Sequence, residues 1–377
     1  MTPEPHSHHL FVVFGTRPEA IKLEPLIKAL KQCPDIEPIL VDTGQQPDLL
    51  PAFIEQFGFE IDYNLAAFSA EGSLNQVAGG IISSLDDLLV RYKPDGVVVQ
   101  GDTISAFAAA TAARLRGCAV IHVEAGLRTG DDAHPFPEEL CRRSIAQLAT
   151  LHCSPTELNR QNLLREGIAA ERIVVTGNTI VDAVTALVRD AELNAEISTI
   201  ADQFVDRQML LVTLHRRENF GDRLRTYLEG IRRFLANRED VFALFPVHPN
   251  PGVADVVDSV FADLPAMKLI APLNYADFLA LLSRARLVVS DSGGIQEEIA
   301  TVGCPLLILR ESTERPEIVE SGLARMVADP EDLEAALTNA FSETSWIKNV
   351  PTDNPFGDGR SGERIAGLIL EHLTRIS

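Results

Sequence analysis

The stretch VVFGTRPEAIKLEPLIKAL, residues 12–30, decides the fold. It opens as a short hydrophobic run ending at Gly15 and continues with the spacing of an amphipathic helix, which predicts a strand followed directly by a helix. A dinucleotide-binding turn would carry the pattern G-x-G-x-x-G here, whereas Gly15 is followed by the sequence TRPE. The turn therefore favours an anion site made by side chains rather than by a glycine-rich backbone.

Two cations lie in the predicted first helix. Arg17 supplies a planar, permanently ionised group in the turn, and Lys22 brings a second positive charge to the same end of the strand. The alternative is an exposed Arg and Lys on a helix face. Pro25 interrupts the helical pattern, so we expect this helix to be kinked or split near Leu23.

Short hydrophobic runs alternate with helical patterns along most of the chain, and the alternation restarts near residue 207. This pattern predicts parallel sheets covered by helices on both faces. We expect an α/β protein of two Rossmann-like, doubly wound domains facing a cleft. The predicted boundaries are a flexible tail at 1–9, an N-terminal domain at 10–185, a linker helix at 186–206 and a C-terminal domain at 207–361.

Composition limits the possible partners. The 377 residues carry a formal net charge of −21, which would repel nucleic acid and anionic lipid surfaces. We see no run of about 18 apolar residues and no secretory signal, so we expect no membrane partner. The five cysteines are scattered without a C-x-x-C pair, which favours a reducing cytoplasm. We expect no metal, because no H-E-x-x-H pattern or comparable cluster occurs, and no cofactor.

Charged and polar side chains follow many of the predicted strands, at the edge where open α/β sheets bind ligands. These residues are Arg17, Lys22, Asp102, Glu124, Arg128, His215, Arg216, Arg217, His248, Ser292, Gly293, Gly294 and Arg315. Random surface charge would also fall on the outer sides of helices. The concentration at strand ends therefore predicts a charged ligand.

The stretch VVSDSGGIQEEIA, residues 288–300, is the clearest single motif. Gly293 and Gly294 allow close approach of the backbone, the following helix offers free N–H groups, and Ser292 can donate a hydroxyl hydrogen bond. Glu298 could accept two hydroxyl groups of a ribose. The stretch predicts an anion cradle, with an ordinary helix start capped by a serine as the alternative.

Three carboxylates lie just past or near strand ends: Asp102, Glu124 and Glu138. Acid–base chemistry requires one carboxyl group with a raised pKa beside one that stays ionised, and a dry cleft can arrange this. Any one of them alone has a structural explanation. Asp102, for example, could cap the helix that begins near Thr103.

Three histidines follow or lie within predicted strands. His215 follows a strand and precedes two arginines, so it could protonate or clamp a leaving oxygen, with a capping or surface role as the alternative. His248 has a weaker case for a functional role, with shaping of a loop as the alternative. His122 lies inside a hydrophobic strand and is expected in the core.

Read as strings, these residues closely resemble the non-hydrolysing UDP-N-acetylglucosamine 2-epimerases. The matching strings run in order from Phe14 to Gly359: FGTRPEAIK, GDT, HVEAGLRTGD, PFPEE, SPTE, NLLREG, TGNT, HRREN, PVHPN, DSGGIQEE, TERPE and NPFGDG. A match over nearly the whole chain is highly specific.

The resemblance implies a glycosyltransferase-B type of fold, a UDP-sugar in the interdomain cleft and a homodimer built through the N-terminal domain. It implies that a last helix, residues 362–377, packs back on the first domain. By the same resemblance, Arg17, Lys22, Asp102, Glu124 and Glu138 surround the sugar and phosphates. The diphosphate would meet His215 and Arg315, and the nucleoside and its phosphates would meet Phe278, Ser292, Gly293, Gly294 and Glu298.

The activity that the resemblance implies is reversible C2 epimerisation of UDP-N-acetylglucosamine, by elimination of UDP to a 2-acetamidoglucal and re-addition. The carboxylate that acts as the base stays unassigned among Asp102, Glu124 and Glu138. Alternatives are a hydrolysing 2-epimerase, an epimerase of a UDP-diacetamido-uronate, a UDP-sugar glycosyltransferase and a non-catalytic UDP-sugar sensor.

The sequence departs from the family at three places. Where many members have T-A-Q-H-R-x-M, this chain has TGQQPDLL, so Gln46 and Pro47 replace a histidine and an arginine. That region contributes to an activating second UDP-sugar site in bacterial members, and the sequence leaves its presence here open. Cys141 replaces a common asparagine, and Leu273 replaces a glutamine found in some members.

Overall fold

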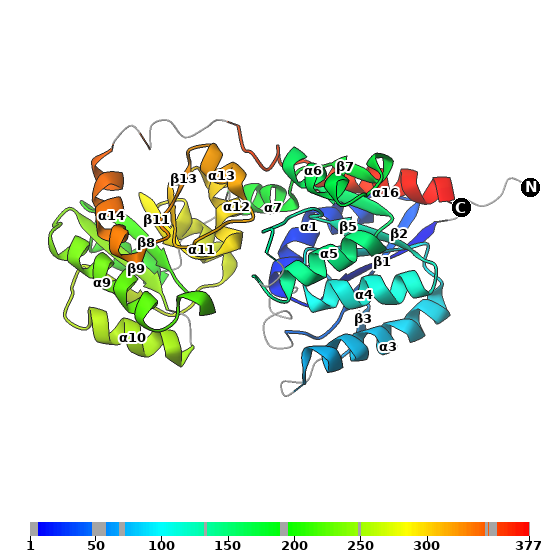
Figure 1. Cartoon of the computed structure of the whole chain (residues 1–377), viewed down its shortest axis with the longest axis horizontal. Helices are drawn as coiled ribbons and strands as arrows, with labels where there is room; N and C mark the ends of the chain where they lie inside the picture. The colour runs from blue at the N-terminus through cyan, green and yellow to red at the C-terminus, as the bar shows by residue number, and fades with distance from the viewer. Residues whose placement is uncertain are drawn as a thin grey trace, which may run out of the picture. The chain divides into compact units, whose positions relative to one another are not determined.

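The computed structural model describes residues 7–46, 58–67, 72–131, 134–188, 195–247, 250–343, 346 and 353–376. The chain divides into two compact units (Figure 1). The first unit comprises Met1–Ala183 and Phe356–Ser377, and the second comprises Val184–Pro355. The last helix of the chain therefore belongs to the first unit.

The first unit is built on a seven-stranded parallel sheet with the order β3-β2-β1-β4-β5-β6-β7. Its strands are β1 (His8–Phe14), β2 (Ile36–Asp42), β3 (Tyr63–Asn64), β4 (Gly96–Gln100), β5 (Ala119–Val123), β6 (Leu151–Ser154) and β7 (Ile173–Val175). Its helices are α1 (Arg17–Lys31), α3 (Leu74–Tyr92), α4 (Ile104–Leu115), α5 (Glu138–Leu148), α6 (Glu157–Arg165), η1 (Ala170–Arg172) and α16 (Ser361–Ile376), and α7 (Thr179–Val188) starts in it.

The second unit is built on a six-stranded parallel sheet with the order β10-β9-β8-β11-β12-β13. Its strands are β8 (Gln208–Thr213), β9 (Val241–Pro246), β10 (Met267–Ile270), β11 (Leu287–Ser290), β12 (Leu306–Ile308) and β13 (Ala324–Met326). Its helices are α8 (Ala195–Asp202), η2 (Arg217–Asn219), α9 (Asp222–Ala236), α10 (Pro251–Phe261), α11 (Tyr275–Leu282), α12 (Gly293–Val302), α13 (Pro316–Glu320), η3 (Pro330–Asp332) and α14 (Leu333–Ser342).

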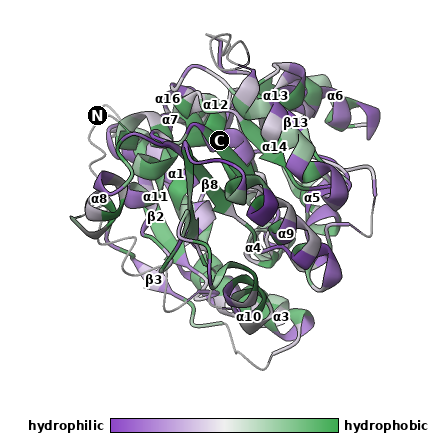
Figure 2. Ribbon diagram, turned by 90° about the vertical axis from the view of Figure 1, so that its left-hand side faces the viewer, coloured by the Kyte–Doolittle hydropathy of each residue, from purple (hydrophilic) through white to green (hydrophobic). Residues whose placement is uncertain are grey.

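Burial on both faces of each sheet explains why the strands are hydrophobic runs rather than alternating patterns. Every residue of β4 and β5 is buried, as is the second half of β1. Figure 2 shows the strands mainly in the hydrophobic colour, whereas the outer helices carry both colours. The predicted fold class of two doubly wound α/β units is confirmed.

Each sheet has a point where the order of its strands reverses, and ligands of open α/β sheets bind there. In the first unit this point lies between β1 and β4, and in the second it lies between β8 and β11. The residues that follow these four strands are therefore the ones placed to form a site.

The predicted N-terminal tail extends two residues too far, because β1 already begins at His8. We expected residues 1–9 to be loose, whereas His8 and His9 begin β1 and pair with Ile36 and Glu37 of β2. The backbone N–H of His9 also donates to the Asp95 carboxylate. The pairing partner, which lies 28 positions further along the chain, is what extends the strand. Residues 1–6 lie outside the described part of the chain.

The predicted split of the first helix is wrong, because α1 runs through Pro25. Proline lacks the N–H that would bond the preceding turn, so this position needs support from packing. Helix α16 packs against α1 here. A Cβ atom on Gly362 of α16 would lie 2.7 Å from the carbonyl carbon of Pro25, so only glycine allows this approach.

Gly15 is required by the packing of the turn, which gives a testable prediction. A Cβ atom there would lie 1.9 Å from Thr43 Oγ1 and 2.4 Å from Ser105 Oγ, and these two hydroxyls hydrogen-bond each other at 2.7 Å. We expect Gly15→Ala to lower the free energy of unfolding by about 1–3 kcal/mol, because overpacking forces side chains to shift. Urea denaturation measures the change.

A second glycine in the same unit provides the control. Gly79 lies in α3, and a Cβ atom added there meets nothing within 4 Å. Gly79→Ala should leave stability unchanged or raise it by up to about 1 kcal/mol, since alanine favours a helix. Equal effects of the two substitutions would contradict the close packing of Gly15.

Candidate active site

The turn after β1 carries Arg17 at the edge where the order of the first sheet reverses. Arg17 is half-buried, and its backbone N–H donates to Gln46 Oε1 at 2.9 Å. Its guanidinium makes no hydrogen bond or ion pair with another described residue. Gln46, the residue that departs from the family pattern, therefore anchors this turn, while Pro47 lies outside the described residues.

Lys22 and Glu124 are brought together from α1 and the end of β5. Both are buried, and the Lys22 ammonium forms a short ion pair with Glu124 Oε2. Glu124 adopts φ = +65°, which is uncommon for a residue with a side chain and costs about 1–3 kcal/mol. Strain of this kind concentrates at functional sites, and no sequence pattern announced it.

Asp102 follows β4 and binds Arg142 of α5. Arg142 Nε and Nη2 lie 2.8 and 2.7 Å from Asp102 Oδ2, and Arg142 Nη1 lies 3.1 Å from the fully buried Glu139. The capping alternative for Asp102 is wrong, because Thr103 caps α4 by accepting from Ala106 N. Sequence reasoning missed Arg142 and Glu139, although Glu139 ends the PFPEE string and Arg142 lies three residues after it.

Glu138 lies near this group without being fixed by it. It is the first residue of α5 and is half-buried. Its neighbour Glu139 is the residue that points into the unit and meets Arg142. The structure thus places Asp102, Glu124 and Glu138 on the loops after β4, β5 and the start of α5.

Arg128 of the strand-end set and the core residue His122 belong to the framework. Arg128 is held by Glu166, whose two carboxylate oxygens each lie 2.7 Å from the guanidinium. His122 is buried in β5, as expected of a core residue, with Nε2 2.8 Å from the Gly101 carbonyl oxygen. Burial lowers the pKa of His122 to about 4, so it is neutral near pH 7.

The second unit places positive groups around the start of α12. A Cβ atom on Gly293 would lie 3.0 Å from Arg315 Nη1, 3.2 Å from Glu314 Oε1 and 3.3 Å from Arg216 Nη2. Two guanidinium groups therefore flank the free N–H groups of the helix, which is the arrangement of an anion site. The capping alternative is wrong, because the Ser292 side chain does not cap α12.

Acidic side chains hold these arginines in place. Arg315 Nε donates to Glu297 Oε1, and Arg315 Nη1 lies 2.7 Å from Glu314 Oε1. Glu314 also pairs with Arg310 at 2.9 Å. Burial, together with the neighbouring charge of Arg310, lowers the pKa of Arg216. The sequence predicted Arg216 and Arg315 but not Glu297, Arg310 or Glu314, because these partners show no pattern along the chain.

His215 is oriented by Asp291, a residue that sequence reasoning missed. The buried Asp291 carboxylate accepts from the backbone N–H groups of His215 and Arg216 and from Asn219 Nδ2. His215 Nδ1 lies 3.4 Å from Asp291 Oδ1, and 42% of the His215 side chain is exposed. The carboxylate therefore fixes the loop and orients the His215 ring.

The remaining predicted residues lie on α11 and α12. Glu298 is buried and its Oε1 accepts from Tyr275 OH at 3.0 Å. Phe278 is half-buried on the same helix as Tyr275, and Gly294 is half-buried at the second position of α12. His248 lies outside the described residues.

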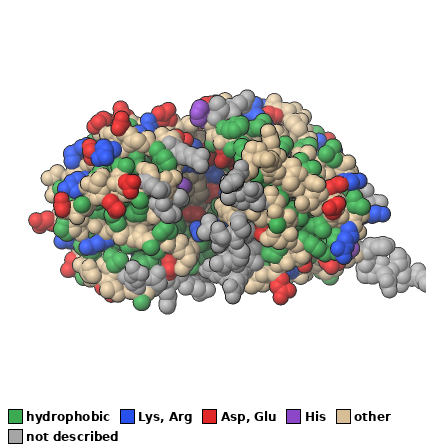
Figure 3. Space-filling model, turned by 90° about the horizontal axis from the view of Figure 1, so that it is seen from below, with side chains coloured by type: hydrophobic (Ala, Val, Ile, Leu, Met, Phe, Trp, Pro, Cys, Tyr) green, Lys and Arg blue, Asp and Glu red, His purple; other side chains and the backbone are tan. Residues whose placement is uncertain are grey.

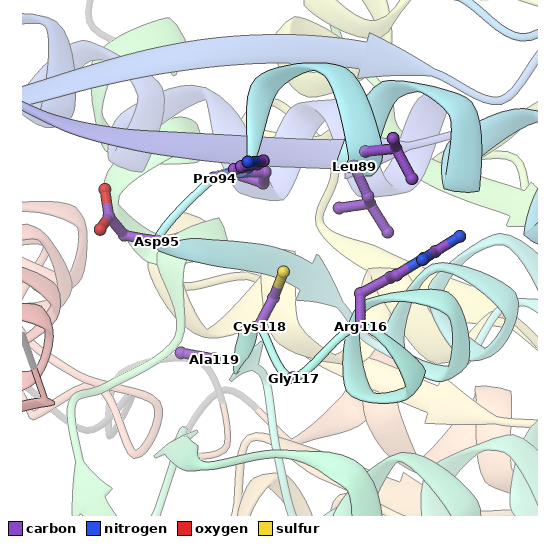
Figure 4. A pocket seen from close by; sticks show the side chains of 9 residues that line it. Leu89, Pro94, Asp95, Arg116, Gly117, Cys118 and Ala119 are labelled. Atoms are coloured by element: carbon purple, nitrogen blue, oxygen red, sulfur yellow. The ribbon is translucent and has the colours of Figure 1, made fainter.

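A cavity of about 550 Å³ lies at the opposite edge of the first sheet (Figure 4). It is lined by residues at the starts of β4 and β5 and the ends of α3 and α4: Leu89, Val90, Lys93, Pro94, Asp95, Arg116, Gly117, Cys118 and Ala119. Ligands of open α/β sheets bind at the other edge, so we assign it no role in the site.

On the face shown in Figure 3, acidic and basic side chains are scattered among the others rather than gathered into one basic patch. Within the described residues, no three His, Cys, Asp or Glu side chains group together in a way that could hold a metal ion. In the same part of the chain, no helix combines the length and hydropathy needed to cross a bilayer.

Comparison with known proteins identifies the family. Residues 28–370 match the family model described as UDP-N-acetylglucosamine 2-epimerase. The chain belongs to the UDP-N-acetylglucosamine 2-epimerase family. It is 38% identical over 365 residues to the enzyme of that name from Bacillus subtilis, covering 96% of this chain and 95% of that one. The family resemblance seen in the sequence is confirmed. The enzymes of this family are isomerases, because epimerisation is an isomerisation.

Solved structures of UDP-N-acetylglucosamine 2-epimerases share the fold. The Neisseria meningitidis enzyme bound to UDP-GlcNAc has a TM-score of 0.90 and 34% identity, covering 96% of this chain and all of that one. The Methanocaldococcus jannaschii enzyme in complex with UDP-GlcNAc and UDP has a TM-score of 0.84 and 35% identity, covering 96% and 99%. A glycosyltransferase from Rickettsia africae, 12% identical with a TM-score of 0.64, shares the fold alone.

Proposed function

We propose that the protein reversibly converts UDP-N-acetylglucosamine into UDP-N-acetylmannosamine without releasing free sugar. One observation carries the proposal. The strand-order reversal of the second unit bears a phosphate-type cradle, and in the first unit the loops after β4 and the neighbouring β5 bear Asp102 and the strained Glu124. The UDP-GlcNAc and UDP bound by the related enzymes support the choice of substrate.

The order of bond breaking follows from the acidity of the sugar. The C2 proton has no adjacent carbonyl, so it becomes acidic only as the C1–O bond to UDP loosens and C1 gains oxocarbenium character. UDP leaves with the electron pair of that bond. A carboxylate then takes the C2 proton, and the C2–H electrons form the C1–C2 double bond of 2-acetamidoglucal. Reprotonation of C2 on the opposite face and attack of UDP on C1 complete the epimerisation.

The second unit is suited to stabilise the leaving UDP. Arg216, Arg315 and the N–H groups at the start of α12 place positive charge around Gly293, where the developing diphosphate charge would lie, and Glu314 holds Arg315 there. His215, whose ring Asp291 orients, would donate a hydrogen bond to the same group. Ser292 and Gly294 would bind the phosphates, and Phe278 and Glu298 the nucleoside.

The first unit is suited to the proton transfers. Glu124 lies beside Lys22, and Asp102 beside Arg142, so each carboxylate has a cation that balances its charge. Glu138 is half-buried at the start of α5. The base is one of Asp102, Glu124 and Glu138, and opposite-face reprotonation requires a second acid. Arg17 would bind the sugar phosphate from this side.

Incubation with UDP-N-acetylglucosamine in deuterated water tests the reaction. We expect deuterium at C2 of both nucleotide-linked epimers, because the proton taken from C2 exchanges with solvent. Release of free N-acetylmannosamine with UDP would establish the hydrolysing reaction instead. Absence of exchange combined with a requirement for an acceptor would establish glycosyl transfer, and binding without any turnover would establish a sensor.

The proposal includes a homodimer formed through the first unit, as the family resemblance implies. Light scattering at micromolar concentration would give twice the mass of the 377-residue chain. A monomer with full epimerase activity would contradict this part of the proposal and leave the reaction untouched.

A further inference from the structure

We propose that the buried Glu19 carboxylate ties the loop after β1 to the loop after β4 and thereby positions Arg17 and Asp102 for the reaction. Glu19 is a positioning residue in this scheme. The inference rests on the proposed function, because the effect is read in the rate of C2 epimerisation. The inference adds Glu19 to the residues of the site. Its position in α1 would by itself indicate only a helix cap.

The hydrogen bonds of Glu19 reach both loops. Its Oε2 accepts from Gly15 N at 3.0 Å, from Thr16 N at 2.8 Å and from Thr16 Oγ1 at 2.8 Å. Its Oε1 accepts from Thr103 Oγ1 at 2.7 Å, a residue 84 positions away. One carboxylate therefore fixes the residues immediately before Arg17 and the residue immediately after Asp102.

The hydrogen bonds of Glu19 matter because of where the two loops lie in the sheet. β1 and β4 are the neighbouring strands at which the order of the first sheet reverses. The carboxyl ends of β1 and β4 lie side by side there. The loop after β1 leads to α1, and the loop after β4 leads to α4. A side chain that bonds both loops sets the distance between their functional residues, which is the kind of geometry on which reaction rates depend steeply.

A capping role alone does not account for Glu19. A Glu at the third position of a helix commonly accepts from the N-cap backbone, and Glu19 does so with Thr16. Such a cap works at the surface, whereas Glu19 is 1% exposed. Burial raises the pKa of Glu19 to about 7, against the lowering effect of its hydrogen bonds from Thr103, Gly15 and Thr16. Helix capping does not require a buried carboxyl group of this kind.

Another helix of the same unit provides a matched control. Gln76 occupies the third position of α3, and its Oε1 accepts from the N-cap backbone of Ser73 at 2.8 Å. That bond is exposed and joins no second loop. Gln76→Ala therefore removes a cap of the same kind without touching the loops after β1 and β4.

Glu19→Gln is the rescue variant, because a glutamine can bond the same partners as Glu19. A glutamine at position 19 could keep its oxygen on the donors from Gly15 and Thr16 and donate its amide to Thr103 Oγ1. A hydroxyl oxygen has two acceptor lone pairs, and this one uses one of them for Ala106 N. Glu19→Gln should therefore keep the two loops tied, whereas Glu19→Ala should separate them.

The experiment measures kcat and KM for C2 epimerisation, C2 deuterium exchange and the melting temperature. We expect Glu19→Ala to lower kcat about tenfold or more, and Glu19→Gln to stay within about threefold of the unchanged protein. Thr103→Val, which removes the Thr103 end of the link together with the side-chain cap of α4, should lower kcat like Glu19→Ala. Thr103→Ser, which keeps both, should not. Gln76→Ala should keep the full kcat.

The outcomes separate the inference from the function on which it rests. Normal kcat in Glu19→Ala or in Thr103→Val, with C2 exchange intact in the unchanged protein, would overturn the positioning role alone. If Glu19→Ala does not fold, the pair Thr103→Val and Thr103→Ser decides the matter by the same criterion. Absence of C2 exchange in the unchanged protein would overturn the proposed function itself.

Discussion

Glu124→Gln is expected to lower the rate of C2 deuterium exchange by about 10²–10⁴-fold while UDP binding stays within about twofold, because a missing proton-transfer group costs a factor of that size. The amide has nearly the shape of the carboxylate, and its oxygen can still accept from the Lys22 ammonium, which now pairs with Glu124. It cannot take up a proton. Exchange followed by NMR and UDP binding followed by calorimetry measure the two effects.

Glu166→Gln is the matched control for this substitution. Glu166 also pairs with a buried cation, since both of its oxygens bind Arg128. We have placed neither residue in the reaction, so exchange should continue at the normal rate. Loss of UDP binding in parallel with exchange would assign Glu124 to binding, and unchanged exchange would leave the proton transfer to Asp102 or Glu138.

The first unit is expected to lose stability steeply below pH 6.5 because of His122 and His152. These histidines lie opposite each other on β5 and β6, with ring centroids 6.5 Å apart. Burial lowers the pKa of His122 to about 4 and that of His152 to about 3. Neither ring nitrogen of His152 has a hydrogen-bond partner among the described residues.

The direction of the effect follows from proton binding. Above about pH 6.5 both histidines are neutral in the folded and the unfolded chain, so stability is full. As pH falls from 6.5 towards the folded values, the unfolded chain binds protons that the folded unit excludes. Each histidine then costs up to about 1.4 kcal/mol per pH unit.

His152→Leu tests this prediction. An apolar side chain leaves no polar atom unsatisfied, so stability at pH 7.5 should change little. The pH dependence of urea unfolding between pH 7.5 and 5 should become shallower by about 1 kcal/mol per pH unit. His134→Gln, at a histidine whose side chain is 78% exposed, should leave the slope unchanged. Equal slopes in all three proteins would show that His152 titrates freely.

The sequence predicted the fold well because hydrophobic runs and turns are local signals. The buried strands β1, β4 and β8 were visible as such runs. Three short strands, β3, β6 and β13, were not foreseen, since they are only 2 to 4 residues long and depend on a neighbouring strand for their pairing. The continuity of α1 through Pro25 depends on contact with α16, which lies more than 300 residues later.

The site could be predicted in part for the same reason. Arg17, Gly293 and Arg315 stand in strings that mark a loop after a strand. Arg142 and Asp291 were missed, because each acts through a partner from another element: Asp102 for the first, and His215 for the second. The left-handed backbone of Glu124 had no sequence signal at all, since such conformations are normally marked by glycine.

The division of the chain has a consequence for biosynthesis. The closing piece of the first unit, Phe356–Ser377, is made last, after the whole of the second unit. Until then, Gly177 and Asn178 lack the segment that packs on them, and Asp182 lacks the Gly362 N–H that it accepts. On the ribosome, the first unit therefore begins before the second unit and is completed after it. A stop codon before Phe356 would leave the first unit without its closing segment.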